Sequence, residues 1–496
     1  MGIRTGAAYR QSLADGRALY VNGDKVTDVT AFAPYRGIID EMAAHYDRHH
    51  DPALAPVLTF PSPVDGAPVS NSFLQVRDWA HMEQRLAGER ARAEFTYGLM
   101  GRLPDFMNAF VTDMLEVSAQ LGGGAHDYAG NVQRYQAWCR DNDVCLTHTL
   151  VDPQIDRSRG VEAQQSLRRV RETDAGLVVS GARMLSTLAP VSQELLVGAF
   201  MPRNPGEEDY AVAFAVPLAT PGLKVVCREP FDAGRSRFDR PLSGRFDEGD
   251  AIVIFDDVLV PWERVFCNGD LGAYGALVPA FLPGYLMLQA VIRGAAKLHF
   301  LTGIAIKVAA AVGRSEMPRY QELIGELLGF GELAEAAIEG TARQLFATLN
   351  PEAAAAQVPP ATRAWQQGSN FTRPERGAAA FAAIRFLFPM ANERAREIMQ
   401  MMGSSGLIMT PTEADLAHPD LADLLPKYLR GRELDTRERV RIMKLAWDAM
   451  ATEFGSRQSL YEMFFAGDPV FGRVLFSQMP RRYAAEGMVE RLLAES

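Results

Sequence analysis

The spacing of apolar and polar residues changes twice along the chain. Up to residue 143, apolar positions recur three and four residues apart, which predicts helices. From residue 144, short runs of Val, Ile, Leu and Phe are separated by Gly, Pro and Asp, which is typical of β-strands. After Pro261 the helical spacing returns almost to the end of the chain. We therefore expect an N-terminal helical domain (1–143), a central β domain (144–270) and a C-terminal helix-bundle domain (271–496).

The pattern also predicts individual elements. Helices are expected at 6–20, 35–50, 76–100, 104–120, 286–312, 319–349, 374–402 and 436–465. Strands are expected at 144–151, 176–182, 193–200, 209–217, 222–227 and 251–260. These strands follow one another without intervening helices, which favours an antiparallel barrel or sandwich over a doubly wound sheet. The four long C-terminal helices predict a bundle, and Pro389 should kink the third of them.

Composition narrows the class of protein without identifying it. The 496 residues are 48% apolar and 23% charged, and the net charge of −10 argues against a general nucleic-acid binder. The four cysteines show no CxxC pair or zinc-like spacing, which indicates reduced thiols. No signal peptide is apparent, and no run of eighteen apolar residues is free of charge and proline. We expect a soluble, cytoplasmic protein.

Two short stretches are candidates for a metal site or a phosphate-binding loop. His45 and His49 lie four residues apart on one predicted helix, with His50 beside them, but no HExxH motif accompanies them. We therefore favour an exposed helix end over a ligand cluster. Gly122-Gly123-Gly124 lacks the Lys-Ser/Thr and the preceding strand of a phosphate loop, so we interpret it as a flexible turn.

One histidine and one arginine stand out as candidates for catalysis. His148 lies on a short apolar strand that ends at Asp152-Pro153, and Arg102 follows the glycine-containing run Tyr97–Gly101. A neutral imidazole can bind or accept a proton near neutral pH, and a guanidinium can stabilise a developing oxyanion. Without further information, His148 is as well explained as a satisfied structural group and Arg102 as a cation at a helix C-terminus.

Several stretches spread over nearly the whole chain carry a family resemblance. They are Tyr97–Arg102 with Pro104-Asp105, His148 with Pro153–Arg157, Pro241–Glu248, Asp257–Glu263 and Trp447-Asp448 through Glu453–Gly455. With the order of helices, β module and helices, they resemble the flavin-dependent 4-hydroxyphenylacetate 3-monooxygenase family. This family comprises the oxygenase components of two-component phenol hydroxylases. The resemblance implies an acyl-CoA dehydrogenase-like fold, mainly α with a central antiparallel β module.

The resemblance also implies a reaction. Reduced FAD, supplied by a separate NAD(P)H:flavin reductase, would react with molecular oxygen to give a flavin C4a-hydroperoxide that hydroxylates a phenol ortho to its hydroxyl group. Arg102 and His148 would be the catalytic residues, meeting over the aromatic substrate. The family also leads us to expect a homo-oligomer, either a dimer or a tetramer.

The FAD site is likewise implied by the family. It would be formed by His148, Thr149, Leu150, Val151, Gln154, Ile155, Asp156 and Arg157, by Ser186 and Thr187, and by Tyr461, Glu462, Met463 and Phe464. The last helix departs from the family, which usually has an Asn after its Tyr-Glu step where this chain has only apolar residues.

Two further departures fall at expected substrate-binding positions. Phe106 stands where family members acting on 4-hydroxyphenylacetate carry a tyrosine, so the ring is kept and a hydroxyl donor is lost. Met201-Pro202 replace small polar groups that bind the substrate carboxylate, although Arg203 beside them could pair an acid. These changes favour a tyrosine-like, carrier-tethered or substituted phenol over a simple arylacetate.

Three alternative functions fit the sequence less well. A 4-hydroxybutyryl-CoA dehydratase shares the fold but needs cluster ligands, and no cysteine lies upstream of Cys139. An acyl-CoA dehydrogenase needs a carboxylate base, which composition allows but the motifs do not match. A non-catalytic helical scaffold is disfavoured because Arg102 and His148 are both retained.

Overall fold

The computed structural model describes residues 2–121, 126–156, 158–199, 201–280, 284–362 and 377–495. Its N-terminal part contains α1 (Gly6–Ser12), α2 (Arg36–Arg48), α3 (Ala55–Leu58), α4 (Trp79–Phe95), α5 (Pro104–Glu116) and α6 (Tyr128–Asn142). The short strands β1 (Leu19–Val21), β2 (Asp24–Val26), β3 (Thr59–Pro61) and β4 (Pro68–Ser70) lie between them. The expected turn at Gly122–Gly124 falls outside the described residues.

The helix predicted for 6–20 is wrong in its second half. It ends at Ser12, and the chain turns through Gly16, whose φ of 77° favours glycine. Leu19 and Tyr20 then form a strand that pairs in parallel with β10. Leu19 is therefore buried in a sheet rather than on the face of a helix.

The central part of the chain forms two open sheets. The strands are β5 (Leu146–Thr149), β6 (Arg168–Thr173), β7 (Gly176–Arg183), β8 (Glu194–Val197), β9 (Val212–Pro217), β10 (Leu223–Cys227), β11 (Ala251–Pro261) and β12 (Val265–Asn268). One sheet has the order β2-β1-β10-β11-β7-β6 and the other β12-β9-β8-β5. Most pairs are antiparallel as predicted, but β5 with β8 and β1 with β10 are parallel.

The two sheets share one hydrophobic core, as a sandwich does. Phe214 of β9 meets Phe255 of β11 edge to face, with ring centroids 5.9 Å apart. Along β11, alternate side chains are buried until the register shifts between Phe255 and Val258. This bulge accommodates Asp256-Asp257 and returns Val258 to the buried face, so the period of two is kept on both sides.

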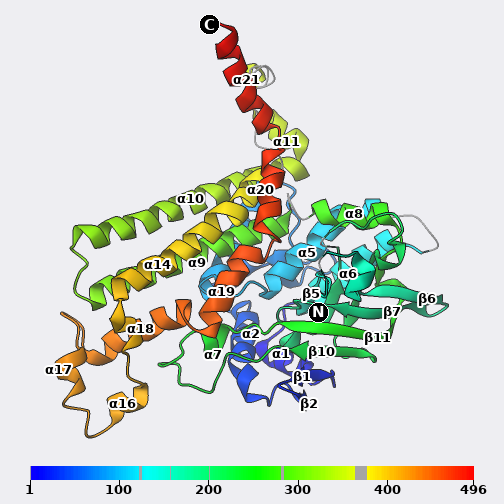
Figure 1. Ribbon diagram of the computed structural model, residues 1–496. Helices are drawn as coiled ribbons and strands as arrows, with labels where there is room; N and C mark the ends of the chain where they lie inside the picture. The colour runs from blue at the N-terminus through cyan, green and yellow to red at the C-terminus, as the bar shows by residue number, and fades with distance from the viewer. Residues whose placement is uncertain are drawn as a thin grey trace.

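The C-terminal part is a helical bundle arranged around one central helix. Its main helices are α8 (Leu271–Ala280), α9 (Tyr285–Ala311), α10 (Pro318–Leu349), α14 (Phe388–Gly403), α18 (Thr436–Met450) and α19 (Glu453–Phe464). α9 contacts α4, α5, α10, α14 and α18, and Figure 1 shows it between α14 and the N-terminal helices. By length and composition α9 could cross a membrane, but 61% of its most apolar window is buried inside the protein. It is therefore well explained as the core helix of the bundle.

Two predicted long helices are interrupted. The helix predicted at 374–402 consists of α13 (Ala378–Ala382), a π-helical turn at Ala383–Leu387 and α14. Pro389 lies in the first turn of α14. The kink predicted at Pro389 therefore falls next to an irregular turn, in the place where the missing N–H of proline disturbs helical hydrogen bonding. The segment predicted as 436–465 breaks at Ala451, and Thr452 caps α19 by accepting a hydrogen bond from Gly455 N–H. The predicted start at Pro374 lies outside the described residues.

Short helices complete the chain: α7 (Ser243–Phe246), α11 (Pro351–Ala356), α15 (Ser405–Ile408), α16 (Glu413–Ala417) and α17 (Leu425–Leu429). The last two helices, α20 (Pro469–Ser477) and α21 (Arg481–Ala494), extend away from the body of the molecule (Figure 1). None of the fourteen residues of α21 is buried in the single chain.

Candidate active site

Arg102 and His148 lie side by side in the interior. His148 is on β5, a strand whose four residues are all buried, and Arg102 is in the loop between α4 and α5. Arg102 Nε donates a hydrogen bond to His148 Nε2 over 2.6 Å, and the two residues are only 6% and 5% exposed. The structure therefore brings together the two side chains that the sequence singled out.

The pKa of His148 lies well below its ordinary value of 6.5. Burial is the main cause, because it disfavours the charged imidazolium, and the positive charge of Arg102 adds to it. His148 is therefore neutral at neutral pH. Since Nε2 accepts from Arg102, the proton resides on Nδ1, which is buried and has no hydrogen-bond partner among the described residues.

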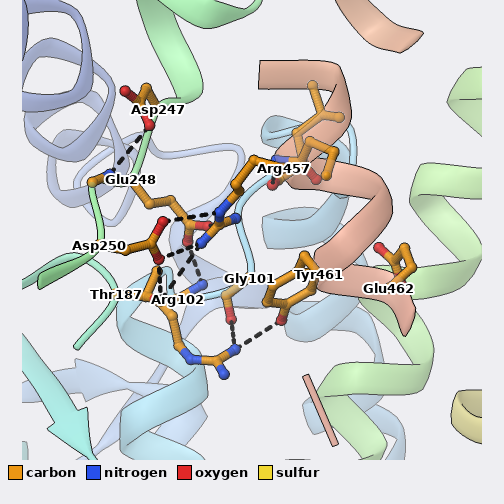
Figure 2. Close-up of polar contacts among 12 residues, drawn as sticks. Gly101, Arg102, Thr187, Asp247, Glu248, Asp250, Arg457, Tyr461 and Glu462 are labelled. Atoms are coloured by element: carbon orange, nitrogen blue, oxygen red, sulfur yellow. Dashed lines mark hydrogen bonds and ion pairs between the residues drawn. The ribbon is translucent and has the colours of Figure 1, made fainter. Parts of the chain in front are cut away.

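Arg102 also contacts four other residues. Its backbone N–H donates to Glu248 Oε1 over 2.6 Å, and Nη1 donates to the carbonyl of Gly101 (3.0 Å) and to Tyr461 Oη (2.7 Å). Its guanidinium carbon lies 3.8 Å from the centre of the Phe106 ring, close enough for a cation–π contact. Figure 2 shows the hydrogen bonds to Gly101 and Tyr461.

A second group of charges fixes the loop that carries Glu248. Arg457 of α19 binds Glu248 Oε2 through Nη1 (3.1 Å) and Asp250 Oδ1 through Nη2 (2.8 Å), as Figure 2 shows. Burial alone would raise the pKa of Asp250, but Arg457 and Arg228 outweigh it and keep that pKa far below its usual range. Asp250 therefore remains ionised and ties the β11 side of the site to α19.

A third group ties α19 to α9. Arg293 donates to both oxygens of Glu462 (2.6 and 2.9 Å), and Lys297 Nζ lies 3.0 Å from Glu462 Oε1. All three side chains are at most 3% exposed. Burial opposes the ionisation of Glu462, yet Arg293 and Lys297 lower its pKa to about 2. Burial lowers the pKa of Lys297 to about 8.

Comparison with known proteins decides between the readings of this site. The model of the 4-hydroxyphenylacetate 3-hydroxylase N-terminal region matches residues 5–267, and that of the C-terminal region matches 281–494. The chain belongs to the 4-hydroxyphenylacetate 3-hydroxylase family. It is therefore an enzyme, the oxygenase component of a two-component aromatic monooxygenase that uses reduced FAD and oxygen.

Similar proteins cover almost the whole chain. The 4-hydroxyphenylacetate 3-monooxygenase oxygenase component of Thermus thermophilus is 37% identical over 99% of this chain and 97% of its own. A Streptomyces globisporus monooxygenase, whose substrate is a 3-amino-3-(3-chloro-4-hydroxyphenyl)propanoyl group on a peptidyl carrier protein, is 32% identical over 94% of this chain and 85% of its own. A crystal structure of a family oxygenase with FAD and 4-hydroxyphenylacetate matches with a TM-score of 0.86 at 35% identity, covering 99% of both chains.

More distant structures show the fold alone. A 4-hydroxybutyryl-CoA dehydratase from N. maritimus has a TM-score of 0.81 at 20% identity, over 100% of this chain and 95% of its own. A glutaryl-CoA dehydrogenase has a TM-score of 0.52 at 11% identity, over 97% and 95% of the two chains. The predicted acyl-CoA dehydrogenase-like fold is confirmed.

The residues of this family member fit FAD at the end of β5. Thr149 Oγ1 and Ser186 Oγ are buried without a hydrogen-bond partner among the described residues, as is His148 Nδ1. Thr147 Oγ1 donates to the carbonyl of Thr187 over 2.5 Å, which places the segments of Thr149 and Ser186 next to each other. Unpaired buried polar atoms are costly, so the hydroxyls of Thr149 and Ser186 suit the polar edge of a flavin, whereas His148 points to the opposite face of β5.

At other positions expected to bind FAD, the polar groups already have partners or the side chains are exposed. Thr187 Oγ1 already donates to Asp250 (2.6 Å), and the carboxylate of Glu462 is occupied by Arg293 and Lys297. Ile155 and Phe464 are 64% and 49% exposed. No unpaired buried polar atom belongs to the side chains of Leu150, Val151, Asp156 and Met463. Arg157 lies outside the described residues.

The expected substrate loop is more open than the Arg102 site. Met201 is 47% exposed and Pro202 is exposed as well. Arg203, which the sequence suggested for pairing an acid, binds Asp152 instead (2.8 and 3.0 Å), and Arg183 binds the same carboxylate over 2.5 Å. A substrate acid at Arg203 would have to share it with Asp152.

The prediction of an exposed helix end at His45 and His49 is wrong. They are 3% and 0% exposed, and their rings pack edge to face 5.1 Å apart. In the described residues no group of three or more His, Cys, Asp or Glu side chains could hold a metal ion. These histidines are core residues of the N-terminal part.

Glu248, Asp250 and Arg457 are site residues that were not predicted from the sequence. Glu248 lies in a stretch that carried the family resemblance, but nothing in the sequence indicated that its carboxylate would bind the backbone of Arg102, 146 residues away. A run of three acids at Asp247, Glu248 and Asp250, just before a predicted strand, was the available signal.

Proposed function

We propose that this enzyme hydroxylates a phenol at the carbon ortho to its hydroxyl group, and that Arg102 and His148 bind the phenol oxygen. The observation that carries the proposal is the buried contact between Arg102 Nε and the neutral His148. It leaves an N–H of His148 and part of the Arg102 guanidinium for a ligand.

The chemistry of the ring explains why such a pair is useful. A phenol reacts faster with an electrophilic oxygen when its own oxygen carries negative charge. A permanent cation and a neutral N–H donor in a dry site stabilise that charge without reorganising. Bound reduced FAD would supply the oxygen-transfer chemistry, and Thr149 and Ser186 are the residues we expect to hold its polar edge.

We further propose that the substrate is a larger or substituted phenol rather than simple 4-hydroxyphenylacetate. Phe106 offers Arg102 a ring without a hydroxyl, and Arg203 is engaged by Asp152. Both features suit a substrate that lacks a small carboxylate near the ring. A carrier-bound phenol, as in the Streptomyces globisporus relative, or a nitrophenol, as in a Rhodococcus relative, fits this description.

The test supplies reduced FAD through a flavin reductase and screens free and carrier-bound phenols. We expect coupled formation of a catechol from at least one phenol, measured against the NADH and oxygen consumed. His148→Ala should consume oxygen without forming catechol, while His299→Ala, an exposed histidine of α9, should behave as wild type. Failure to hydroxylate any phenol while flavin is reduced normally would refute the proposal.

We also propose that the enzyme is a homo-oligomer, as expected from its family. The apolar residues Tyr483, Val489 and Leu492 of α21 are 57–68% exposed in the single chain. An extended helix with exposed apolar side chains is well suited to pack against a second copy.

A further inference from the structure

Tyr461 presents its hydroxyl group to the catalytic arginine. Arg102 Nη1 donates to Tyr461 Oη over 2.7 Å, so the tyrosine oxygen is an acceptor in this contact. The hydroxyl hydrogen of Tyr461 is then left to donate elsewhere, and no acceptor is bonded to it within the described residues. Arg102 Nη2 likewise makes no hydrogen bond or ion pair in that part of the chain. Two donors beside Arg102 Nη1 are therefore without an acceptor among the described residues.

The position of Tyr461 is fixed by its neighbours. Its ring stacks on Phe465 with centroids 5.0 Å apart, and the adjacent Glu462 is bound by Arg293 and Lys297. One turn earlier, Gln458 Nε2 donates to the carbonyl of Leu99 over 2.9 Å, which ties α19 to the loop of Arg102. The hydroxyl is therefore held in place by α19 rather than by the contact with Arg102 alone.

Gly101 makes the approach possible. A Cβ atom at this residue would lie 2.2 Å from Tyr461 Oη, well inside van der Waals contact. The loop and α19 therefore meet with no side chain between them, and Figure 2 shows Tyr461 reaching the guanidinium of Arg102 past Gly101. The part of Tyr461 that approaches Gly101 is the hydroxyl-bearing end of its ring.

On the other side of Arg102 lies Phe106, whose ring centre is 3.8 Å from the guanidinium carbon. Phe106 can offer only its ring face. It therefore supplies no hydroxyl group to a phenol oxygen at Arg102.

We propose that Tyr461 is a specificity-determining residue of the phenol site, whose hydroxyl donates a hydrogen bond to the substrate oxygen beside Arg102. This inference rests on the proposed function and deepens it. It assigns to α19 the hydroxyl that Phe106 lacks on α5. Because Arg102 also donates to the carbonyl of Gly101, removing the hydroxyl leaves the arginine with its other contacts.

The test uses 4-nitrophenol, a coloured phenol whose absorbance reports its ionisation, bound to the enzyme with oxidised FAD. The variants are Tyr461→Phe, Phe106→Tyr and the two combined, with Tyr428→Phe, a 79% exposed tyrosine, as control. A hydrogen bond to a charged oxygen corresponds to roughly tenfold or more in affinity. We expect Tyr461→Phe to weaken nitrophenolate binding about tenfold and to shift ionisation of the bound probe to higher pH by about one unit.

The double variant and the flavin separate this role from others. Phe106→Tyr should restore part of the lost affinity in the Tyr461→Phe background, and FAD affinity should stay unchanged in both. If Tyr461→Phe leaves the pH profile and affinity of nitrophenol unaltered, or weakens only FAD binding, the inference is overturned and the proposed function stands. If the wild type binds FAD but no nitrophenol, this inference fails, whereas the proposed function is decided by the screen of phenols.

Discussion

Buried neutral histidines distinguish this protein at the scale of single residues. His45, His49 and His148 are each at most 5% exposed, and burial is the main cause that lowers the pKa of each. Among these three, His148 alone accepts a hydrogen bond from a guanidinium group. This contact uses Nε2 and leaves the N–H at Nδ1 for a ligand. The same residue type thus packs in the core at two positions and lies in the candidate catalytic site at the third.

The buried histidines make stability depend on pH. Burial lowers the pKa of His49 to about 3, whereas in the unfolded chain it is near 6.5. Between these values the unfolded state binds the proton and the folded state does not, so stability is complete above pH 6.5 and falls as the pH decreases. The contribution lost at pH 5 is about 2 kcal/mol, from roughly 1.4 kcal/mol per pH unit.

Urea unfolding of wild type and His49→Gln at pH 7 and pH 5 measures this effect. The variant should lose about 2 kcal/mol less stability than wild type between the two pH values. As a control, His418→Gln removes an exposed histidine and should follow the wild type. Equal pH dependence in His49→Gln and wild type would contradict the assignment.

Gly101 gives a second prediction at this scale. Gly101→Ala should displace Tyr461, because the new Cβ would lie 2.2 Å from its hydroxyl oxygen. We expect at least a tenfold loss of phenol hydroxylation from a misplacement of this size. Gly303→Ala on α9, where a Cβ meets nothing within 4 Å, is the matched control and should remain active.

Contacts between distant residues were the least predictable part of the site. The sequence pointed to Arg102 and His148, and the resemblance named Tyr461 only as an FAD contact; its hydrogen bond to Arg102, 359 residues away, was not predicted. A carboxylate such as Glu248 binds a backbone N–H with no motif to announce it. Such pairings depend on how the elements pack, and local pattern carries no information about that.

At the scale of elements, the ion pairs between α9 and α19 hold the bundle against the site. Glu462→Ala would leave Arg293 and Lys297 buried without their carboxylate, which costs about 3–5 kcal/mol of stability. Chemical denaturation measures the loss. The control Glu322→Ala breaks an ion pair with Arg319 whose side chains are more than half exposed, and it should have little effect. Similar stability of both variants would exclude this role for Glu462.

Helices and strands were largely predictable where one spacing of apolar residues continues along the segment. All six strands expected between 144 and 260 exist, because each has either a buried run of residues or alternating buried and exposed residues. The strands β6 and β12 were missed because Arg168–Thr173 is mostly charged, and Val265–Asn268 is too short to show alternation. At 6–20 the helical spacing was misleading, since the strand at Leu19 is stabilised by pairing with distant β10.

At the scale of the whole molecule, α21 bears on assembly. If its exposed apolar residues pack against another copy, Val489→Asp with Leu492→Asp should dissociate the oligomer, because charge in an apolar interface is unpaired. Sedimentation velocity measures the change in mass. Val64→Asp, at a 73% exposed position in the turn between β3 and β4, is the control. An unchanged mass in the double variant would assign assembly to another surface.

The central claim is that a phenol bound at Arg102 and His148 receives an oxygen atom from O₂. It is tested most directly by running the reaction with a flavin reductase under heavy-isotope O₂ and determining the mass and structure of the product. The account predicts one labelled oxygen atom ortho to the original hydroxyl with wild type, and no hydroxylated product with His148→Ala. An unlabelled product, or equal labelling with His148→Ala, would contradict it.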